Sequence, residues 1–209
     1  IPVESKREQY LEAVEQICNM LAMDPYPGFE GKYFSMPCRN IVPKPAQRPH
    51  PPLWVACSNR ETIKMAARLG IGALTFAFVD PLEAKHWVDE YYSIIKSDEC
   101  VPIGHTVNAN IAMVTSFSLH QDREEAINRG LEGFEFFGYA LGALYGFGEH
   151  KPGRTNLFKQ FREAREKQLV DIAESLTGAR GGIGTPDDMR GHLKKFEKVG
   201  VDQVTFIQQ

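Results

Sequence analysis

The chain has 209 residues, of which 43% are hydrophobic and 24% are charged, and these values are typical of a folded globular protein rather than a disordered one. A net charge of -3 gives no electrostatic attraction to nucleic acid or to an anionic membrane, so neither is expected as a partner. No apolar run reaches the roughly 20 residues of a membrane span and no secretory signal is recognised, so we expect a cytoplasmic protein.

The first predicted helix runs from Ser5 to about Leu21. Ser5 and Glu8 have the spacing of a capping box, and apolar residues then recur at helical intervals. Proline-containing turns end this helix, and Phe29 to Met36 predicts a turn with a short pair of strands at the surface. This segment is therefore an excursion that precedes the main sheet.

A proline-rich lead-in then introduces a strand and a helix. Five prolines from Pro43 to Pro52 keep the lead-in extended and withhold backbone donors, so it should not join a sheet centrally. A buried strand is predicted over Leu53 to Ala56. Ser58 and Glu61 have the spacing of a second capping box, and the helix that they start should end at Gly70.

The turn between this strand and this helix is the candidate functional site. A helix N-terminus at the carboxyl end of a parallel strand presents free backbone N–H groups and the positive end of the helix dipole, which suits a phosphate. In the alternative interpretation Ser58 only caps the helix and Arg60 lies in solvent. Cys57 begins the turn and is interpreted as a wall residue rather than a nucleophile. Side-chain donors are available from Ser58, Asn59, Arg60 and Thr62.

The other cysteines are not predicted to have a chemical role. The four cysteines of the chain show no C-x-x-C pair and no neighbouring histidine at metal-ligand spacing. We therefore predict free thiols and no bound metal.

Two further strands follow. The first is expected at residues 73–78, and Asp80 with Pro81 should start a helix whose aromatic residues belong to the core. The second is predicted over about Thr106 to Leu119, with apolar residues on one parity and polar residues on the other. If the polar face of this strand points into an enclosed interior, Ser116 and Ser118 are candidates for a substrate pocket. In an equally supported alternative, this face is exposed to solvent.

The rest of the chain predicts three more helices and a last strand. Asp122 and Glu125 should start a helix that enters the glycine- and aromatic-rich run at 130–148, which favours either close helix packing or an aromatic pocket wall. A charged helix is expected at 156–176. The final helix should open at Thr185 and Pro186, carry His192 on its surface and precede a strand at 201–207. This alternation indicates a parallel α/β sheet but does not separate a barrel from a doubly wound sheet.

Four strings of the sequence resemble one family. The string PKPAQRPHPPLWVACSNRETIKMAARLG, with FEGKYF before it and GGIGTPDDM and GVDQVTF after it, is similar to the bacterial luciferase-like monooxygenases, the LLM class of flavin-dependent oxidoreductases. The resemblance implies a (β/α)8 TIM barrel represented by roughly its C-terminal half, as one domain over residues 1–209 with the N-terminal strands absent. It also implies that the turn after the barrel's fifth strand helps to hold the cofactor phosphate, a role that carries over to Ser58 and Thr62.

The resemblance implies an activity as well. Members use reduced FMN and molecular oxygen to oxygenate a small organic substrate, so a flavin reductase is an expected partner and a homodimer the expected assembly. In one branch a reduced deazaflavin transfers hydride, and a non-catalytic flavin-binding or structural homologue is a further alternative. Catalytic residues are not assigned, because those that touch the reactive ring in the family lie largely on the early strands, and the fragment alone is expected to be inactive.

Overall fold

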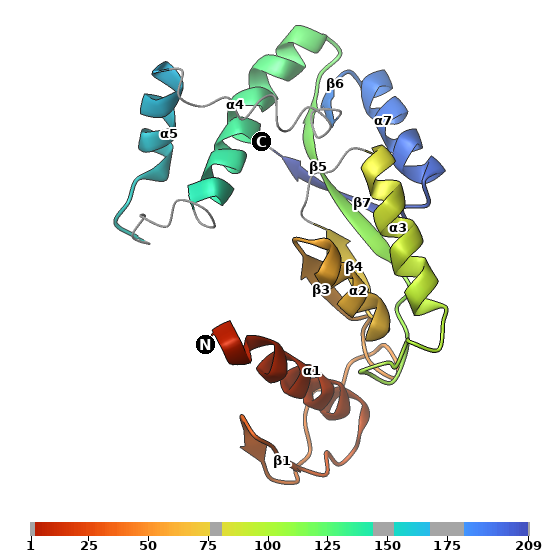
Figure 1. The fold of residues 1–209 in the computed structure, drawn as a ribbon. Helices are drawn as coiled ribbons and strands as arrows, with labels where there is room; N and C mark the ends of the chain where they lie inside the picture. The colour runs from red at the N-terminus through yellow and green to blue at the C-terminus, as the bar shows by residue number, and fades with distance from the viewer. Residues whose placement is uncertain (1–2, 76–80, 144–152, 168–181, 209) are drawn as a thin grey trace. The chain divides into compact units, whose positions relative to one another are not determined.

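The structure is a computed structural model that describes residues 3–75, 81–143, 153–167 and 182–208. Within these ranges the chain is a mixed α/β protein with parallel strand pairs (Figure 1). It divides into two compact units, Ile1–Thr75 with Trp87–Ala112, and Phe76–His86 with Met113–Gln209. The expectation of a single domain over residues 1–209 stays a prediction.

The first unit holds the site predicted from the sequence. In chain order its elements are η1 (Val3–Ser5), α1 (Lys6–Ala22), β1 (Phe29–Glu30), β2 (Ser35–Met36), β3 (Trp54–Cys57), α2 (Arg60–Arg68), β4 (Gly72–Thr75) and the part of α3 (Pro81–Ile95) that begins at Trp87.

The expected capping box at the start of α1 does not form. Ser5 is the N-cap residue, but its side chain makes no cap bond and its hydroxyl instead accepts a hydrogen bond from Gln9. Glu8 is not available to complete the box, because its carboxylate pairs with Lys32 and accepts from the Tyr33 hydroxyl. A long-range contact thus replaces the local one.

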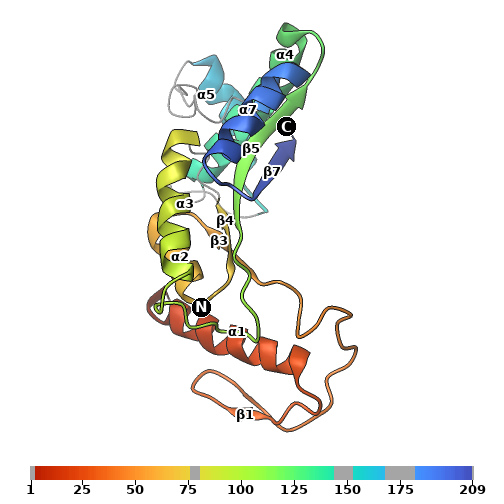
Figure 2. The same ribbon diagram turned by 90° about the vertical axis from the view of Figure 1, so that its right-hand side faces the viewer.

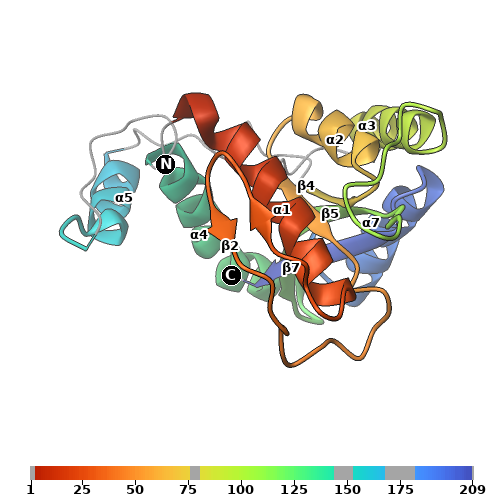
Figure 3. The same ribbon diagram turned by 90° about the horizontal axis from the view of Figure 1, so that it is seen from below.

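The predicted short strand pair is present and is fastened to α1. β1 and β2 pair antiparallel, and Figure 3 shows them alongside α1. The Glu12 carboxylate accepts hydrogen bonds from three successive backbone N–H groups of the connecting turn, those of Lys32, Tyr33 and Phe34, at 2.9–3.2 Å. The proline-rich lead-in at 43–52 contributes to no strand, as expected.

β3, α2 and β4 form the predicted strand–helix–strand unit. β3 and β4 pair in parallel over their full lengths, from Trp54 opposite Gly72 to Cys57 opposite Thr75. α2 buries Ile63, Ala66 and Ala67, the apolar face that its sequence predicts. Gly70 then ends the helix with a positive φ of 66°, a conformation that glycine adopts at little cost.

Tyr91 of α3 fixes the start of the next strand. Its hydroxyl contacts the carbonyl oxygens of Ile71 and Asn108 and accepts from the N–H of Asn110. Tyr91 and Trp87 are buried, so their predicted place in the core is confirmed. Tyr92 is only half-buried, so the same prediction is wrong for it. The prediction of a strand start at Thr106 is wrong, because β5 begins at Ile111. The side-chain amide of Asn108 instead donates to the Leu53 carbonyl, and that of Asn110 donates to the Asn108 side chain.

The second unit contains the remaining elements. They are the start of α3, β5 (Ile111–Leu119) from Met113, α4 (Arg123–Gly142), α5 (Leu157–Glu166), β6 (Ile183–Gly184), α7 (Pro186–Lys198) and β7 (Gln203–Gln208). β5 pairs in parallel with β6. β7 also pairs with β5, and Figure 2 shows these two strands side by side. The two-residue strand β6 was not predicted, because its residues read as a glycine-rich loop.

α7 confirms one prediction and corrects another. Thr185 and Asp188 form a complete capping box, with Pro186 opening the helix. His192 does not lie on the surface: it is buried, and one of its ring nitrogens lies 3.0 Å from the Thr115 hydroxyl of β5. The prediction of a surface histidine is therefore wrong.

The glycine-rich helix α4 packs closely on β5. A Cβ atom at Gly130 would overlap with the side chain of Ser118, so the glycine permits this approach. Aromatic rings of α4 and α5 also cluster, with Phe136 contacting Phe158 and Phe161. Gly130 thus agrees with close helix packing, and an aromatic pocket wall stays a prediction. Residues 144–148 of this run lie outside the described ranges.

Candidate functional site

A cavity of about 410 Å³ lies at the carboxyl end of β3 in the first unit. Three elements form it: the first turns of α1, the strand β3, and the turn that leads into α2. Its lining includes three of the five predicted cofactor-binding residues, together with residues from α1 that the sequence did not indicate. The lining residues are Lys6, Arg7, Tyr10, Val55, Ala56, Ser58, Asn59, Thr62 and Met65.

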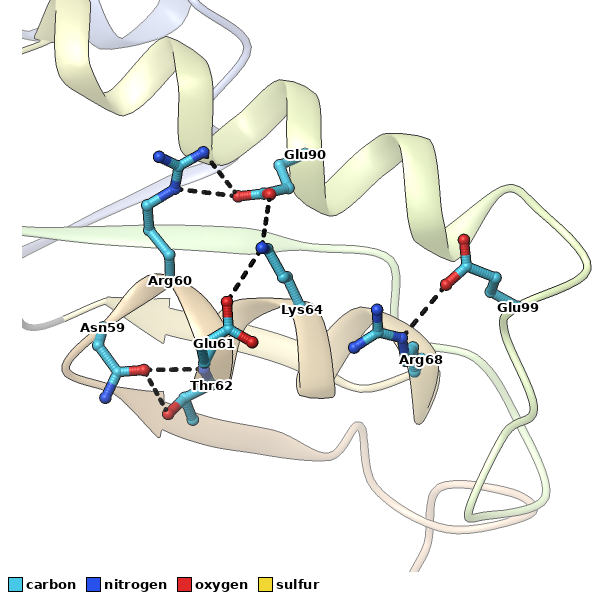
Figure 4. A network of polar contacts seen from close by, with 8 residues as sticks. All are labelled: Asn59, Arg60, Glu61, Thr62, Lys64, Arg68, Glu90 and Glu99. Carbon is cyan, nitrogen blue, oxygen red and sulfur yellow. Dashed lines mark hydrogen bonds and ion pairs between the residues drawn. The ribbon is translucent and has the colours of Figure 1, made fainter.

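Asn59, not Ser58, caps α2. Its side-chain oxygen accepts hydrogen bonds from the Thr62 N–H at 3.0 Å and from the Thr62 hydroxyl at 3.1 Å (Figure 4). The prediction of a capping box between Ser58 and Glu61 is therefore wrong by one residue. The Ser58 hydroxyl is left exposed on the cavity wall, without a hydrogen-bond partner among the described residues.

Arg60 turns away from the cavity. Its guanidinium group lies 3.1 Å from the Glu90 carboxylate on α3, and Glu90 also pairs with Lys64 of α2. Figure 4 shows these three side chains in one network, which Glu61 joins through Lys64. Burial raises the pKa of Glu90, but the two cations outweigh it and hold that pKa below its usual range. Arg60 thus stabilises the packing of two helices.

The start of α2 retains free backbone donors next in the chain to Asn59, which lines the cavity. The backbone N–H groups of Arg60 and Glu61 have no acceptor among the described residues, as is usual for the first turn of a helix. The partial positive charge of the helix N-terminus lies at the same place. These donors and the Ser58 hydroxyl lie in the turn where the sequence predicts a phosphate site, and phosphate binding there stays a prediction.

Lys6 and Arg7 bring positive charge to this cavity from the first turn of α1. Neither forms an ion pair or a hydrogen bond with the residues that the structure describes. Sequence patterns do not indicate that they line this cavity, because they precede Ser58 by about 50 positions and look like ordinary exposed cations. Lys6 and Arg7 lie one helical turn before Tyr10, and all three residues of α1 line the cavity. Only the tertiary structure shows this.

Cys57 and Tyr10 are the titratable groups near the apolar wall of the cavity. Cys57 is fully buried, outside the cavity lining, and its thiol donates to the Val55 carbonyl at 3.4 Å. Burial raises the pKa of Cys57 to about 12, so the group remains a thiol at neutral pH. Burial also raises the pKa of Tyr10, which keeps its phenol protonated as a donor. A cofactor contact for Cys57 stays a prediction.

The two serines predicted for a substrate pocket lie in the second unit. Ser116 is buried, and the Ser118 hydroxyl donates to the Ala126 carbonyl of α4 at 2.8 Å. Ser118 therefore faces a helix, contrary to the expected orientation toward an interior. The substrate-pocket role of Ser116 and Ser118 stays a prediction.

The donor set of the first-unit cavity fits a phosphate better than a neutral ligand. It combines the Lys6 and Arg7 cations, the Ser58 hydroxyl and the Tyr10 phenol, and no acidic residue lines it in the described part of the chain. Such groups form charge-assisted hydrogen bonds to an anion. The apolar side chains of Val55 and Met65 complete the wall.

Comparison with solved structures shows the same fold in several flavin and F420 enzymes. Monooxygenase RslO1 from Streptomyces bottropensis superposes with a TM-score of 0.67 at 19% identity, covering 100% of this chain and 55% of its own. An F420-dependent secondary alcohol dehydrogenase, in complex with an F420-acetone adduct, gives 0.67 at 15% identity, covering 100% and 58%. The FMN complex of the oxygenating constituent of 3,6-diketocamphane monooxygenase from Pseudomonas putida gives 0.60 at 15%, covering 99% and 57%.

These comparisons also bear on the fold class. The chain spans between 55% and 58% of the lengths of these three proteins, and its parallel α/β arrangement is that of part of the predicted (β/α)8 barrel. The search of curated protein sequences found no match. No helix in the described ranges is both long and apolar enough to cross a membrane. The family model for luciferase-like monooxygenases matches residues 1–203, and the chain therefore belongs to that family.

Proposed function

We propose that the chain is the phosphate-binding part of a flavin-dependent monooxygenase, which uses reduced FMN and molecular oxygen on a small organic substrate. Family membership and the FMN-bound relative support the class of reaction. The single observation that carries the assignment within this chain is the cavity at the carboxyl end of β3, where unpaired donors converge.

In this proposal the groups of the turn between β3 and α2 bind the phosphate. The Ser58 hydroxyl and the N–H groups of Arg60 and Glu61 donate to the phosphate oxygens, while Asn59 holds the turn in place through its bonds to Thr62. Thr62 lies at the cavity wall and contributes mainly through this cap. The reduced flavin supplies the electrons for oxygen activation, and the protein positions it and excludes water.

A deazaflavin-dependent hydride transfer is the second candidate. It is favoured by the F420-dependent alcohol dehydrogenase and by an F420-dependent tetrahydromethanopterin reductase from Methanopyrus kandleri, both of which share the fold. Oxygen uptake with FMN, NADH and a flavin reductase, compared with anaerobic reduction of F420, separates the two reactions. We further propose a homodimeric, cytoplasmic full-length protein that receives its reduced flavin from such a reductase.

The phosphate site is tested by replacing Ser58. We expect Ser58→Ala to weaken FMN binding about tenfold, because one charge-assisted hydrogen bond of about 1.5 kcal/mol is lost. Riboflavin lacks the phosphate and should bind unchanged, and both affinities are measured by flavin fluorescence. Thr62→Ala, alone and combined with Ser58→Ala, measures the contribution of the Thr62 hydroxyl, because the backbone N–H of residue 62 still donates to Asn59.

The matched control is Ser35→Ala, an exposed serine of β2 outside the cavity lining. It should leave both affinities unchanged. An equal loss of FMN and riboflavin affinity in Ser58→Ala would instead mean that the phosphate binds elsewhere and that Ser58 only shapes the turn.

A further inference from the structure

A single carboxylate on α3, that of Glu90, holds two cations of α2. The Nε and Nη2 atoms of Arg60 both lie 3.1 Å from one carboxylate oxygen of Glu90. The Lys64 ammonium group lies 3.1 Å from the other oxygen. In Figure 4 the Arg60 side chain reaches toward α3, while Asn59 and Thr62 interact at the turn itself. Both oxygens of this carboxylate are thus engaged by α2.

The two cations depend on Glu90 to different extents. Lys64 has a second carboxylate partner, that of Glu61 at 3.0 Å. Arg60 has no carboxylate partner other than Glu90 among the described residues. The Arg60 side chain is 51% exposed, so the ion pair rather than close packing holds its guanidinium group in place. Loss of the charge on Glu90 should therefore free Arg60, whereas Lys64 stays paired.

A freed Arg60 would be close to a phosphate bound at the start of α2. Arg60 is the first residue of this helix and follows Asn59, which lines the cavity, but Arg60 itself is not among the lining residues. A guanidinium group matches a phosphate through paired, charge-assisted hydrogen bonds. The Glu90 carboxylate and a phosphate at this turn therefore compete for the same cation.

We infer that Glu90 is a positioning residue that limits the affinity of the site for FMN, because it holds the Arg60 guanidinium group against α3 and away from the cofactor phosphate. This inference rests on the proposed function and concerns the regulation of that site. A protein that receives reduced flavin from a separate reductase must also release the oxidised flavin, and moderate phosphate binding favours this exchange. Affinity differences between variants of one site lie mainly in the dissociation rate, so Glu90 should keep FMN release fast.

The experiment measures the affinities of Glu90→Gln for FMN and riboflavin by fluorescence titration at about 0.1 M salt, where charges more than about 10 Å apart are largely screened. Glutamine has the size of glutamate without its charge, so it removes the ion pair with little change in shape. We expect FMN to bind about threefold more tightly and to dissociate about threefold more slowly, the effect of one partly exposed ion pair. Riboflavin, which has no phosphate, should bind unchanged. A purely structural role of Glu90 would instead weaken the binding of both ligands.

Two further variants locate the cause of the gain. Glu90→Gln combined with Arg60→Gln should lose the gain, because the freed cation is then absent while the backbone N–H of residue 60 remains. The matched control is Glu99→Gln, which frees Arg68, a cation 3.2 Å from Glu99 at the other end of the same helix. This control changes the net charge by the same amount, but Arg68 lies about two helical turns from the site, so both affinities should stay unchanged.

The outcomes separate this inference from the function on which it rests. An unchanged or weaker FMN affinity in Glu90→Gln, a gain that survives in the double variant, or an equal gain in Glu99→Gln overturns the role of Glu90 while leaving the Ser58 site in place. If Glu90→Gln does not fold, Glu90→Asp, whose shorter side chain loosens the contact with Arg60, should show a smaller gain, and its absence overturns the inference. If the unsubstituted protein binds FMN no better than riboflavin, the phosphate site itself is wrong and this inference falls with it.

Discussion

Single residues in this chain act through partners that are far away in the sequence. Glu12 shows this most clearly, since one carboxylate accepts from three backbone N–H groups about 20 positions further along. Arg60 is a second case, because a donor expected at the cavity instead pairs with Glu90 on another helix. Residue roles of this kind depend on which helices meet, and local sequence patterns do not contain that information.

Replacing Glu12 should therefore destabilise the protein. We expect Glu12→Ala to lower the free energy of unfolding by about 1–3 kcal/mol, because three N–H groups of the β1–β2 turn lose their acceptor. Urea denaturation followed by circular dichroism measures the change. Glu15→Ala, an exposed glutamate on the same helix, is the control and should stay within about 0.5 kcal/mol. Equal effects of the two substitutions would show that the turn does not depend on Glu12.

The candidate site was predictable from the sequence only in part. The strand–turn–helix pattern placed Ser58, Asn59 and Thr62 at a helix start, and all three line the cavity. It did not separate Ser58 from Asn59 as the cap, because both residue types cap helices well and they are adjacent. Lys6 and Arg7 could not be found at all, since only the packing of α1 beside β3 brings them to the same cavity.

At the scale of whole elements, patterns with a short period were the most reliable. α2 has the buried face, and α7 the capped N-terminus, that their sequences predict, because helical spacing and caps are local properties. The two errors in these helices are the N-cap of α2, which is Asn59 instead of Ser58, and the burial of His192 in α7. β6 was missed since two residues carry no periodicity. The burial of His192 could have been recognised, because it shares a helix face with the buried Met189 and Phe196.

The packing of α4 on β5 gives a prediction at this scale. Gly130→Ala should destabilise the protein by about 1–2 kcal/mol, since the added methyl group overlaps with Ser118, although alanine has the higher helix propensity. Thermal and urea denaturation measure the effect.

Gly191→Ala is the matched control, because this glycine lies on α7 with nothing within 4 Å of an added Cβ atom. It should stabilise the protein by up to about 1 kcal/mol. Stabilisation by Gly130→Ala of the same size would contradict the close approach of α4 to β5.

At the scale of the whole molecule, the periodicity of the sequence predicts an α/β sheet, and the family resemblance predicts which kind of α/β fold it is. Alternating strands and helices are compatible with a barrel or with a doubly wound sheet, and the superpositions with luciferase-like proteins agree with the barrel. The chain spans 55% of monooxygenase RslO1, and its cofactor-binding candidates lie in the first unit alone. The phosphate-binding cavity can therefore be tested without knowledge of the substrate.

The most direct test of this account is the position of the phosphorus atom in a crystal structure of the protein with FMN. We predict that the phosphate oxygens lie about 2.5–3.2 Å from the Ser58 hydroxyl and the N–H groups of Arg60 and Glu61. A phosphate bound outside this cavity, for example at the start of α7, where Thr185 and Asp188 already satisfy each other, would contradict the central claim.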